Sequence, residues 1–117
     1  APGSKWLAEE TKNSILTVPV GLDESWGLDH GSWSVLKHLY PAADIPVIEL
    51  SLDYTKDTLY HYNLAKELAG LRKKGVLIIG SGNMVHSFQY ARFSGDFNVH
   101  FGHDWAIEAN ESFKKLI

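Results

Sequence analysis

Three short apolar runs, separated by stretches with helical patterning, constrain the fold of this chain more than any other feature of its sequence. They are LTVPV, IPVIELSLD and VLIIG, at residues 16–20, 45–53 and 76–80. Such runs are typical of β-strands, and the second is continuous enough to suit a strand covered on both faces. Strands that alternate with helices along a chain favour a parallel sheet. The sequence therefore predicts a three-layer α/β fold, with a mostly parallel central sheet and helices on both faces.

Residues that typically begin or end helices predict helices on both sides of these runs. Ser4 can cap a first helix over about residues 5–16. A second helix is expected to begin at His30 or Ser32 and to stop before Pro41, because a proline disfavours helical geometry in the residue before it. Both helices would then flank the predicted strands.

Two further helices are expected in the second half of the chain. The segment YTKDTLYHYNLAKELAGLRKKG has a helical stripe of apolar residues, with Thr55 or Asp57 as its cap. Its basic last turn complements the helix dipole, and Gly75 is expected to end it. The amphipathic segment HDWAIEANESFKKLI is expected to form the last helix, capped by Asp104.

Composition excludes several classes of function. The 117 residues suit one domain, and the net charge of −3 without a basic run argues against nucleic acid or anionic membranes as partners. The chain has no cysteine, which rules out disulfides and thiolate metal sites and fits a cytoplasmic protein. No run is long enough to span a bilayer, and no signal peptide opens the sequence. Because the sequence starts without methionine, we expect a processed chain or an excised piece.

The stretch VLIIGSGNMVHS, from Val76 to Ser87, joins a predicted strand to a glycine turn and a histidine. It lacks the third glycine of a dinucleotide fingerprint, the lysine of a P-loop and the glycine spacing of a nucleophile elbow around Ser81. What remains is a turn that Asn83 can hold and that places His86 beyond the strand end. Ligands bind at the carboxyl ends of parallel strands, so His86 is a candidate active-site residue.

A second candidate lies in the polar, aromatic segment SWGLDHGSWSVL, which follows another predicted strand. Here His30 lies at a helix start that disfavours its charged form, whereas Asp29 beside it favours that form. Trp26 and Trp33 flank His30, and they either shape a pocket for an aromatic substrate or pack on the sheet. Both histidine loops fall at one predicted sheet edge, where His30 and His86 would form an acid–base or metal constellation.

The remaining histidines are expected to have other roles. His38 and His61 lie on predicted helices and are expected to face solvent. His100 and His103 have an H-x-x-H spacing, which metal sites also use. We expect these two to be loop and helix-start residues rather than metal ligands.

The segments WGLDHGSW, YPAADIPVIELSLD and LAKELAGLRKKGVLIIGSGNMVH together resemble the class III extradiol ring-cleaving dioxygenases of the LigB superfamily. The likeness is greatest to the 4,5-DOPA dioxygenase branch and runs through nearly the whole chain in order. GLDHGSW and GSGNxxH are specific together, although neither is alone. In this family a non-haem Fe(II), or zinc in some DOPA-branch members, holds a catecholate, and O₂ cuts the ring beside its two hydroxyls.

The resemblance implies roles for individual residues. His86 matches the acid–base histidine of the glycine turn, which is counted as a metal ligand in some zinc-bound members. His30 matches the histidine of the DHG loop, which hydrogen-bonds substrate or bound oxygen. Trp33 and Asn83 are expected to contact the substrate. Ser87 stands where the family usually has an asparagine.

The family's other metal-binding residues have no counterpart in this sequence. They are an HGSP-type histidine and a second histidine from an N-terminal segment, and a further ligand from a C-terminal one. APGS at residues 1–4 resembles YPAPGS from the middle of the family sequence. We therefore expect residues 1–117 to be a single partial catalytic domain that binds Fe(II) or Zn(II) weakly and is inactive alone.

The function implied is extradiol cleavage of a DOPA-like catechol with O₂ by the parent protein. The residues leave two alternatives open: a metal-free α/β module that binds a small molecule or a partner, and a metal-dependent hydrolase. Hydrolysis would proceed without oxygen, and the binding module would lack the family's other histidines in its flanking sequence. The sequence gives no indication of the oligomeric state.

Overall fold

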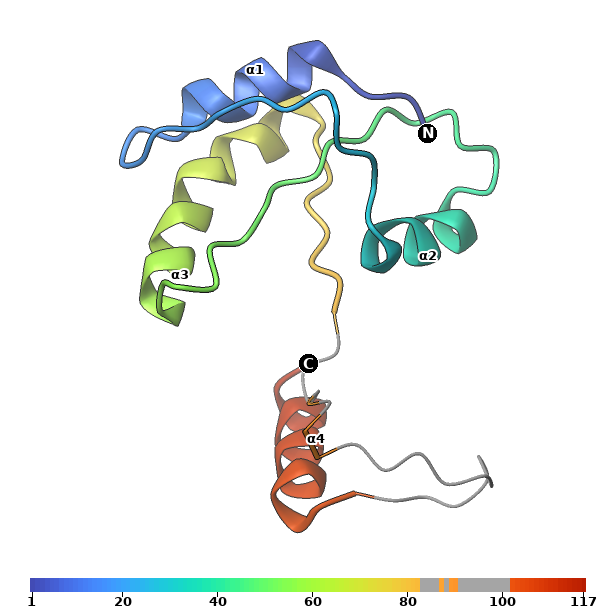
Figure 1. The fold of residues 1–117 in the computed structure, drawn as a ribbon, viewed down its shortest axis with the longest axis vertical. Coiled ribbons are helices and arrows are strands. Elements are labelled where there is room, and N and C mark those ends of the chain that lie inside the picture. Colours follow the sequence, from blue (N-terminus) through green and yellow to red (C-terminus); the bar gives the residue numbers. More distant parts are fainter. Residues whose placement is uncertain (83–86, 88, 91–101) are drawn as a thin grey trace. The chain divides into compact units, whose positions relative to one another are not determined.

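The fold is seen in a computed structural model that describes residues 1–82, 87, 89–90 and 102–117 (Figure 1). The chain divides into two compact units, residues 1–81 and 82–117. In the described parts its elements, in chain order, are α1 (Lys5–Ser14), α2 (His30–Leu39), α3 (Thr58–Glu67), the 3₁₀ helix η1 (Leu68–Lys74) and α4 (Asp104–Leu116). The first unit therefore contains every element except α4.

The predicted α/β fold is wrong, because the described residues form no strand and no sheet. The three apolar runs are extended segments that do not pair with one another through backbone hydrogen bonds. In segment 45–53, the N–H of Val47 instead donates to the carbonyl of Pro2 at 2.9 Å. A strand needs a neighbour that pairs with its backbone, and a local apolar pattern does not specify that neighbour. The three-layer, mostly parallel sheet is thus absent from the part of the chain that the structure describes.

The same three segments contribute to one small hydrophobic core in the first unit. Its buried members are Ile15, Leu68 and Leu71. The half-buried side chains packed against them are Val18, Val20, Leu50, Leu64 and Val76. Each extended segment also leaves apolar side chains exposed, among them Leu52 at 74% and Leu77 at 66%. The segments are therefore covered on one side only, and not on both faces as expected.

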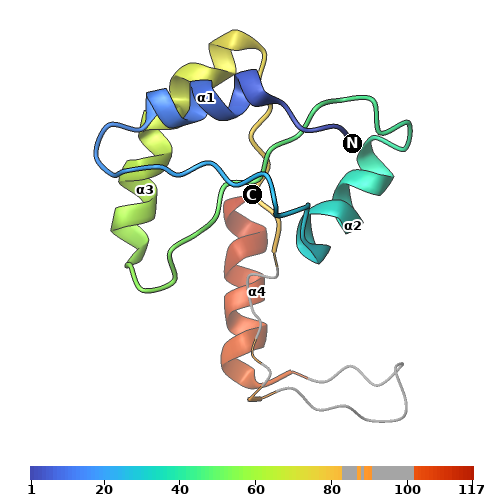
Figure 2. The same ribbon diagram turned by 45° about the horizontal axis from the view of Figure 1, so that its top comes forward.

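Helix α1 lies alongside η1 (Figures 1 and 2), and the core joins Leu68 and Leu71 of η1 to Ile15, the residue that follows α1. Ser4 caps α1 as predicted, since its hydroxyl accepts the N–H of Leu7 at 3.1 Å. Just beyond α1, the carboxylate of Glu67 accepts the N–H of Leu16 and the hydroxyl of Thr17, each at 2.5 Å. These bonds join the end of α1 to the end of α3.

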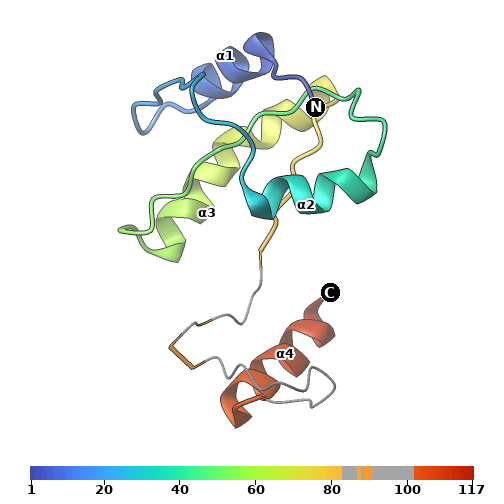
Figure 3. The same ribbon diagram turned by 45° about the vertical axis from the view of Figure 1, so that its right-hand side comes forward.

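The long helix predicted to end at Gly75 is divided into α3 and η1. Asp57, the second of the two predicted caps, accepts the N–H of Tyr60 at 2.8 Å and starts α3. Gly75 ends η1 in a left-handed conformation with φ of 80°, as its position after the basic turn predicted. Lys74 of the last turn forms an ion pair with Glu10 of α1. Figure 3 follows the chain from the end of α2 through segment 45–53 to the start of α3.

In the second unit, α4 begins one residue away from its expected cap. His103 occupies the cap position and Asp104 is the first helical residue. An acidic side chain is favoured in the first turn as well as at the cap, which explains why the local pattern did not separate the two positions. His103 stacks on Trp105, with ring centroids 6.1 Å apart, and so is the helix-start residue that was expected. His100 lies outside the described residues.

Candidate active site at the start of helix α2

Asp29 and Ser32 define where α2 begins. The carboxylate of Asp29 accepts the N–H of Ser32 at 2.8 Å and caps the helix. This bond is the main reason why the pKa of Asp29 lies below its usual value of 3.8. His30 is consequently the first residue of the helix, which is one of the two predicted starts.

His30 is exposed and contacts the indole of Trp33 one turn further along α2. Their ring centroids are 5.4 Å apart and their planes are 88° apart, an edge-to-face arrangement. Trp33 itself is 46% exposed. The site therefore presents an accessible imidazole whose ring is oriented by a neighbouring aromatic side chain.

Two distant side chains bind the backbone on either side of His30. The N–H of Asp29 donates to Oε2 of Glu49 at 3.0 Å. The hydroxyl of Ser81 donates to the carbonyl of Gly31 at 2.8 Å. Segment 45–53 and the start of the glycine turn therefore both meet the DHG loop in the first unit.

The motif GLDHGSW contains the histidine of this loop but neither of the residues that bond to the backbone beside it. Ser81 was considered only as a nucleophile and was discounted because no elbow spacing surrounds it, whereas the structure shows its hydroxyl bonded to the backbone of the DHG loop. Glu49 had a usable signal, because it is an acidic residue within the apolar run IPVIELSLD. His86 and Asn83, predicted as the catalytic or metal-binding and substrate-binding residues of the glycine turn, lie outside the described residues and stay predictions.

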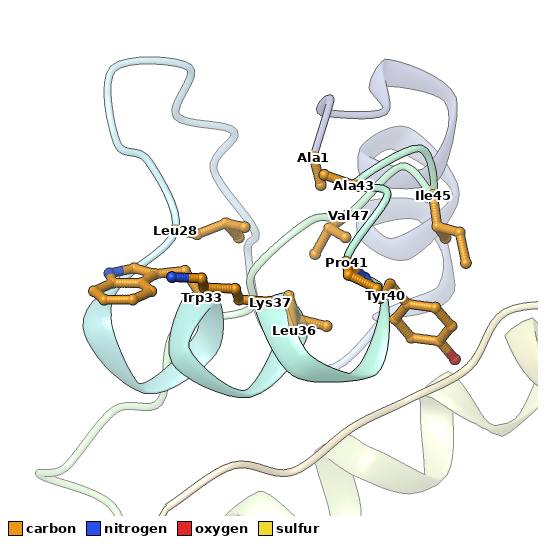
Figure 4. A pocket seen from close by; sticks show the side chains of 10 residues that line it. All are labelled: Ala1, Leu28, Trp33, Leu36, Lys37, Tyr40, Pro41, Ala43, Ile45 and Val47. Atoms are coloured by element: carbon orange, nitrogen blue, oxygen red, sulfur yellow. The ribbon is translucent and has the colours of Figure 1, made fainter.

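A pocket of about 170 Å³ extends along α2 from Trp33 to Tyr40 (Figure 4). Its lining is mainly apolar and consists of Ala1, Leu28, Trp33, Leu36, Lys37, Tyr40, Pro41, Ala43, Ile45 and Val47. Trp33 lines this pocket, and the described residues contain no sheet on which it could pack. Contact with an aromatic substrate stays a prediction. Trp26, by contrast, is 75% exposed.

His30 has no set of metal ligands around it among the described residues. No three histidine, aspartate or glutamate side chains in that part of the chain lie close enough together to hold a metal ion. The nearby carboxylates of Asp29 and Glu49 are instead occupied with backbone N–H groups. A non-haem iron or zinc site requires at least three protein ligands, so these residues do not fit one by themselves.

Of the two helical histidines expected to face solvent, only one does so. His38 is exposed on α2. His61 is half-buried, with Nδ1 2.9 Å from the carbonyl oxygen of Asp57 and its ring edge-on to Tyr60. Its Nε2 is buried without a hydrogen-bond partner among the described residues. The expectation for His61 was wrong because the carbonyl one turn earlier holds the ring against the helix.

None of the helices in the described parts of the chain is long and apolar enough to cross a membrane.

Comparisons with known proteins give the chain a family. The family model described as the catalytic LigB subunit of aromatic ring-opening dioxygenase matches residues 1–116. A 4,5-DOPA dioxygenase extradiol of Escherichia coli (strain K12) is 42% identical over 115 residues, which are 97% of this chain and 41% of the relative. Extradiol 4,5-DOPA dioxygenases of Mirabilis jalapa and Beta vulgaris are 43% and 45% identical over 74% of this chain and 33% of their own lengths.

The chain thus spans between a third and about two fifths of the length of these relatives. No solved structure matches it significantly. The family match extends through both motifs singled out in the sequence, GLDHGSW and GSGNMVH. On this evidence the chain belongs to the LigB family of aromatic ring-opening dioxygenases.

Proposed function

We propose that this chain is part of an extradiol dioxygenase that opens the ring of a DOPA-like catechol with O₂ at a divalent metal, Fe(II) or Zn(II). The observation that carries the proposal is the bond from Ser81 to Gly31, since it joins the two loops that bear the family's motifs. Because the chain spans less than half the length of its relatives, we assign the activity to the complete product of its gene.

Acid–base work is the task proposed for His30 and His86. A catechol has to lose protons before it binds a metal, and protons must be returned as the ring opens. An imidazole exchanges protons near neutral pH and can serve both steps. Asp29 uses its carboxylate to cap α2, where it accepts the N–H of Ser32. The metal would act as a Lewis acid that holds the catecholate and O₂.

Substrate contact is proposed for Trp33 and Asn83. Two contacts support the role of Trp33. Its indole touches the ring of His30, and it also lines the pocket along α2. An aromatic ring bound in that pocket would meet an indole and lie near the proposed acid–base histidine. Asn83 is proposed from the family motif alone.

The test is oxygen uptake with catechols by the complete gene product, loaded separately with Fe(II) and Zn(II). Replacing His30 with Asn is expected to lower kcat by roughly 10²–10⁴-fold, the usual contribution of a general acid or base. The matched control is His38→Asn, which removes an exposed imidazole from the same helix and is expected to leave kcat unchanged. No oxygen uptake with either metal would refute the dioxygenase, and substrate turnover without oxygen would favour the hydrolase alternative.

A measurement of bound metal should distinguish the 117-residue chain from the complete protein. We propose that residues 1–117 bind Fe(II) or Zn(II) weakly and do not cleave catechols, because the sequence resembles the family without the other histidines and the further ligand that hold its metal. Stoichiometric, tightly bound metal in the 117-residue chain would refute this. We also propose a cytoplasmic location, supported by the cysteine-free sequence, which fractionation of cells that express the gene would test.

A further inference from the structure

His30 is held between two backbone hydrogen bonds to remote side chains. Directly before it, Asp29 donates its N–H to Glu49, 20 residues away in sequence. Directly after it, the carbonyl oxygen of Gly31 accepts a hydrogen bond from the hydroxyl of Ser81, 50 residues away. Neither bond touches the imidazole. Both instead fix the backbone from which the imidazole projects.

Helix α2 does not provide this restraint by itself. The N–H of Asp29 lies ahead of the helix and has no helical acceptor, and it donates instead to Glu49. A carbonyl oxygen has two lone pairs, so the carbonyl of Gly31 can accept a second hydrogen bond. Within the helix, Ser34 also donates to Gly31, at 3.4 Å, which is much longer than the 2.8 Å of Ser81.

We propose that Glu49 and Ser81 are positioning residues for His30, an inference that rests on the acid–base role proposed for this histidine above. Glu49 sets the backbone before His30, and Ser81 sets the backbone after it. Together they hold the imidazole in its edge-to-face contact with Trp33, next to the pocket. The glycine turn thus acts on the DHG loop through the hydroxyl of Ser81, not through a nucleophilic step.

The first test observes His30 by NMR in the 117-residue chain and needs no activity. Nuclear Overhauser effects between the rings of His30 and Trp33 report their contact, with His30→Asn used for assignment. Ser81→Ala and Glu49→Ala are expected to weaken these effects and shift the His30 ring signals. Ser81→Thr and Glu49→Gln keep a hydroxyl donor and a carbonyl acceptor, and are expected to restore them.

Two control variants separate this role from a general loss of side chains. Ser34→Ala removes the weaker, local bond to the same carbonyl of Gly31, and Glu9→Ala removes an exposed carboxylate from α1. Neither is expected to move the His30 signals. Far-UV circular dichroism should match the wild type in every variant. Unchanged His30 signals in both Ser81→Ala and Glu49→Ala would overturn the proposal.

The second test measures steady-state kinetics of the complete gene product. Ser81→Ala and Glu49→Ala are expected to lower kcat roughly tenfold or more with KM nearly unchanged, because a misplaced acid–base group slows the chemical step. Ser81→Thr and Glu49→Gln should recover most of kcat. A wild-type enzyme without ring cleavage would refute the proposed function and not the effect on His30. Active variants with unchanged kcat would refute the positioning role alone.

Discussion

At Asp29, one carboxylate determines both where α2 starts and which side chain its first turn presents. Its bond to the N–H of Ser32 keeps Asp29 outside the helix and makes His30 the first helical residue. The partial positive charge of the helix N-terminus favours the ionised carboxylate of Asp29. A residue chosen to cap a helix therefore also sets the electrostatic surroundings of the histidine beside it.

Gly75 provides a prediction at the same scale. Its φ of 80° lies in the left-handed region, while a Cβ built there meets no atom within 4 Å. Gly75→Ala should therefore lower the free energy of unfolding by about 1 kcal/mol through backbone strain alone. The control is Gly70→Ala, which has equally free space without positive φ and should not destabilise the chain. Urea denaturation measures both, and equal effects would exclude the conformational explanation.

Among the elements, several helix ends were predictable from sequence and extended segments were not. Ser4, Asp57 and Gly75 act on backbone groups only a few residues away, so their signals are local and survive in the structure. The segments 16–20 and 76–80 carry an equally clear apolar pattern. Their conformation depends on which backbone lies beside them, and no local pattern encodes that. The sheet was therefore the part of the fold that sequence analysis got wrong.

The contact between α1 and η1 leads to a prediction about the core. Leu71 of η1 is 3% exposed and packs with Ile15, just after α1. Leu71→Ala should lower the free energy of unfolding by about 2–5 kcal/mol, since it leaves a cavity between these elements. Leu59→Ala on α3, where the side chain is 63% exposed, should cost less than about 0.5 kcal/mol. Similar losses for both variants in urea denaturation would show that this core does not stabilise the unit.

The link between the ends of α1 and α3 should make stability depend on pH. The hydroxyl of Thr17, followed by the N–H of Leu16, holds the pKa of Glu67 below its usual value of 4.5. The folded state thus binds the Glu67 proton less readily than the unfolded state. The stabilisation is fully present above pH 4.5, the usual pKa of this carboxyl. It is lost as the pH falls further and passes the lowered pKa of Glu67 in the folded protein.

Replacing Glu67 with Gln tests this linkage. The variant should be less stable than wild type near neutral pH, and the difference should shrink as the pH falls below 4.5. Thermal unfolding followed by circular dichroism from neutral to acidic pH measures the difference. Because Asp29 and Asp53 also have lowered pKa values, some acid destabilisation should remain in the variant. A pH-independent difference between the two proteins would contradict the proposed role of Glu67.

Among the residues that the structure describes, burial is sparse and all four tryptophans are accessible. Their exposed fractions are 56% for Trp6, 75% for Trp26, 46% for Trp33 and 52% for Trp105. Tryptophan emission should therefore resemble that of indole in water, and acrylamide should quench all four residues. Unfolding should change the fluorescence little while far-UV circular dichroism changes fully. A blue-shifted emission that is protected from acrylamide would contradict the exposure of these side chains.

The candidate site shows the same limit of sequence information at the largest scale. His30 and Trp33 are close in sequence and were identified from one short motif. Glu49 and Ser81 reach the same loop from 20 and 50 residues away. Their contribution depends on the path of the chain through the first unit, which the motif does not describe. The candidate residues His30 and Trp33 could thus be named from one motif, whereas the bonds of Glu49 and Ser81 to this loop became visible only in the structure.

The bond between Ser81 and Gly31 also has a consequence for the time course of folding. It closes a loop of 50 residues that contains α3 and η1, and the entropy lost in closing such a loop must be offset by contacts made inside it. We therefore expect α1, α3 and η1 to assemble first, with the surroundings of His30 completed afterwards. In a refolding experiment, the bond between Ser81 and Gly31 would therefore form after the helical signal has returned, so a refolding chain would pass through a stage that is helical before the loop around His30 is fixed.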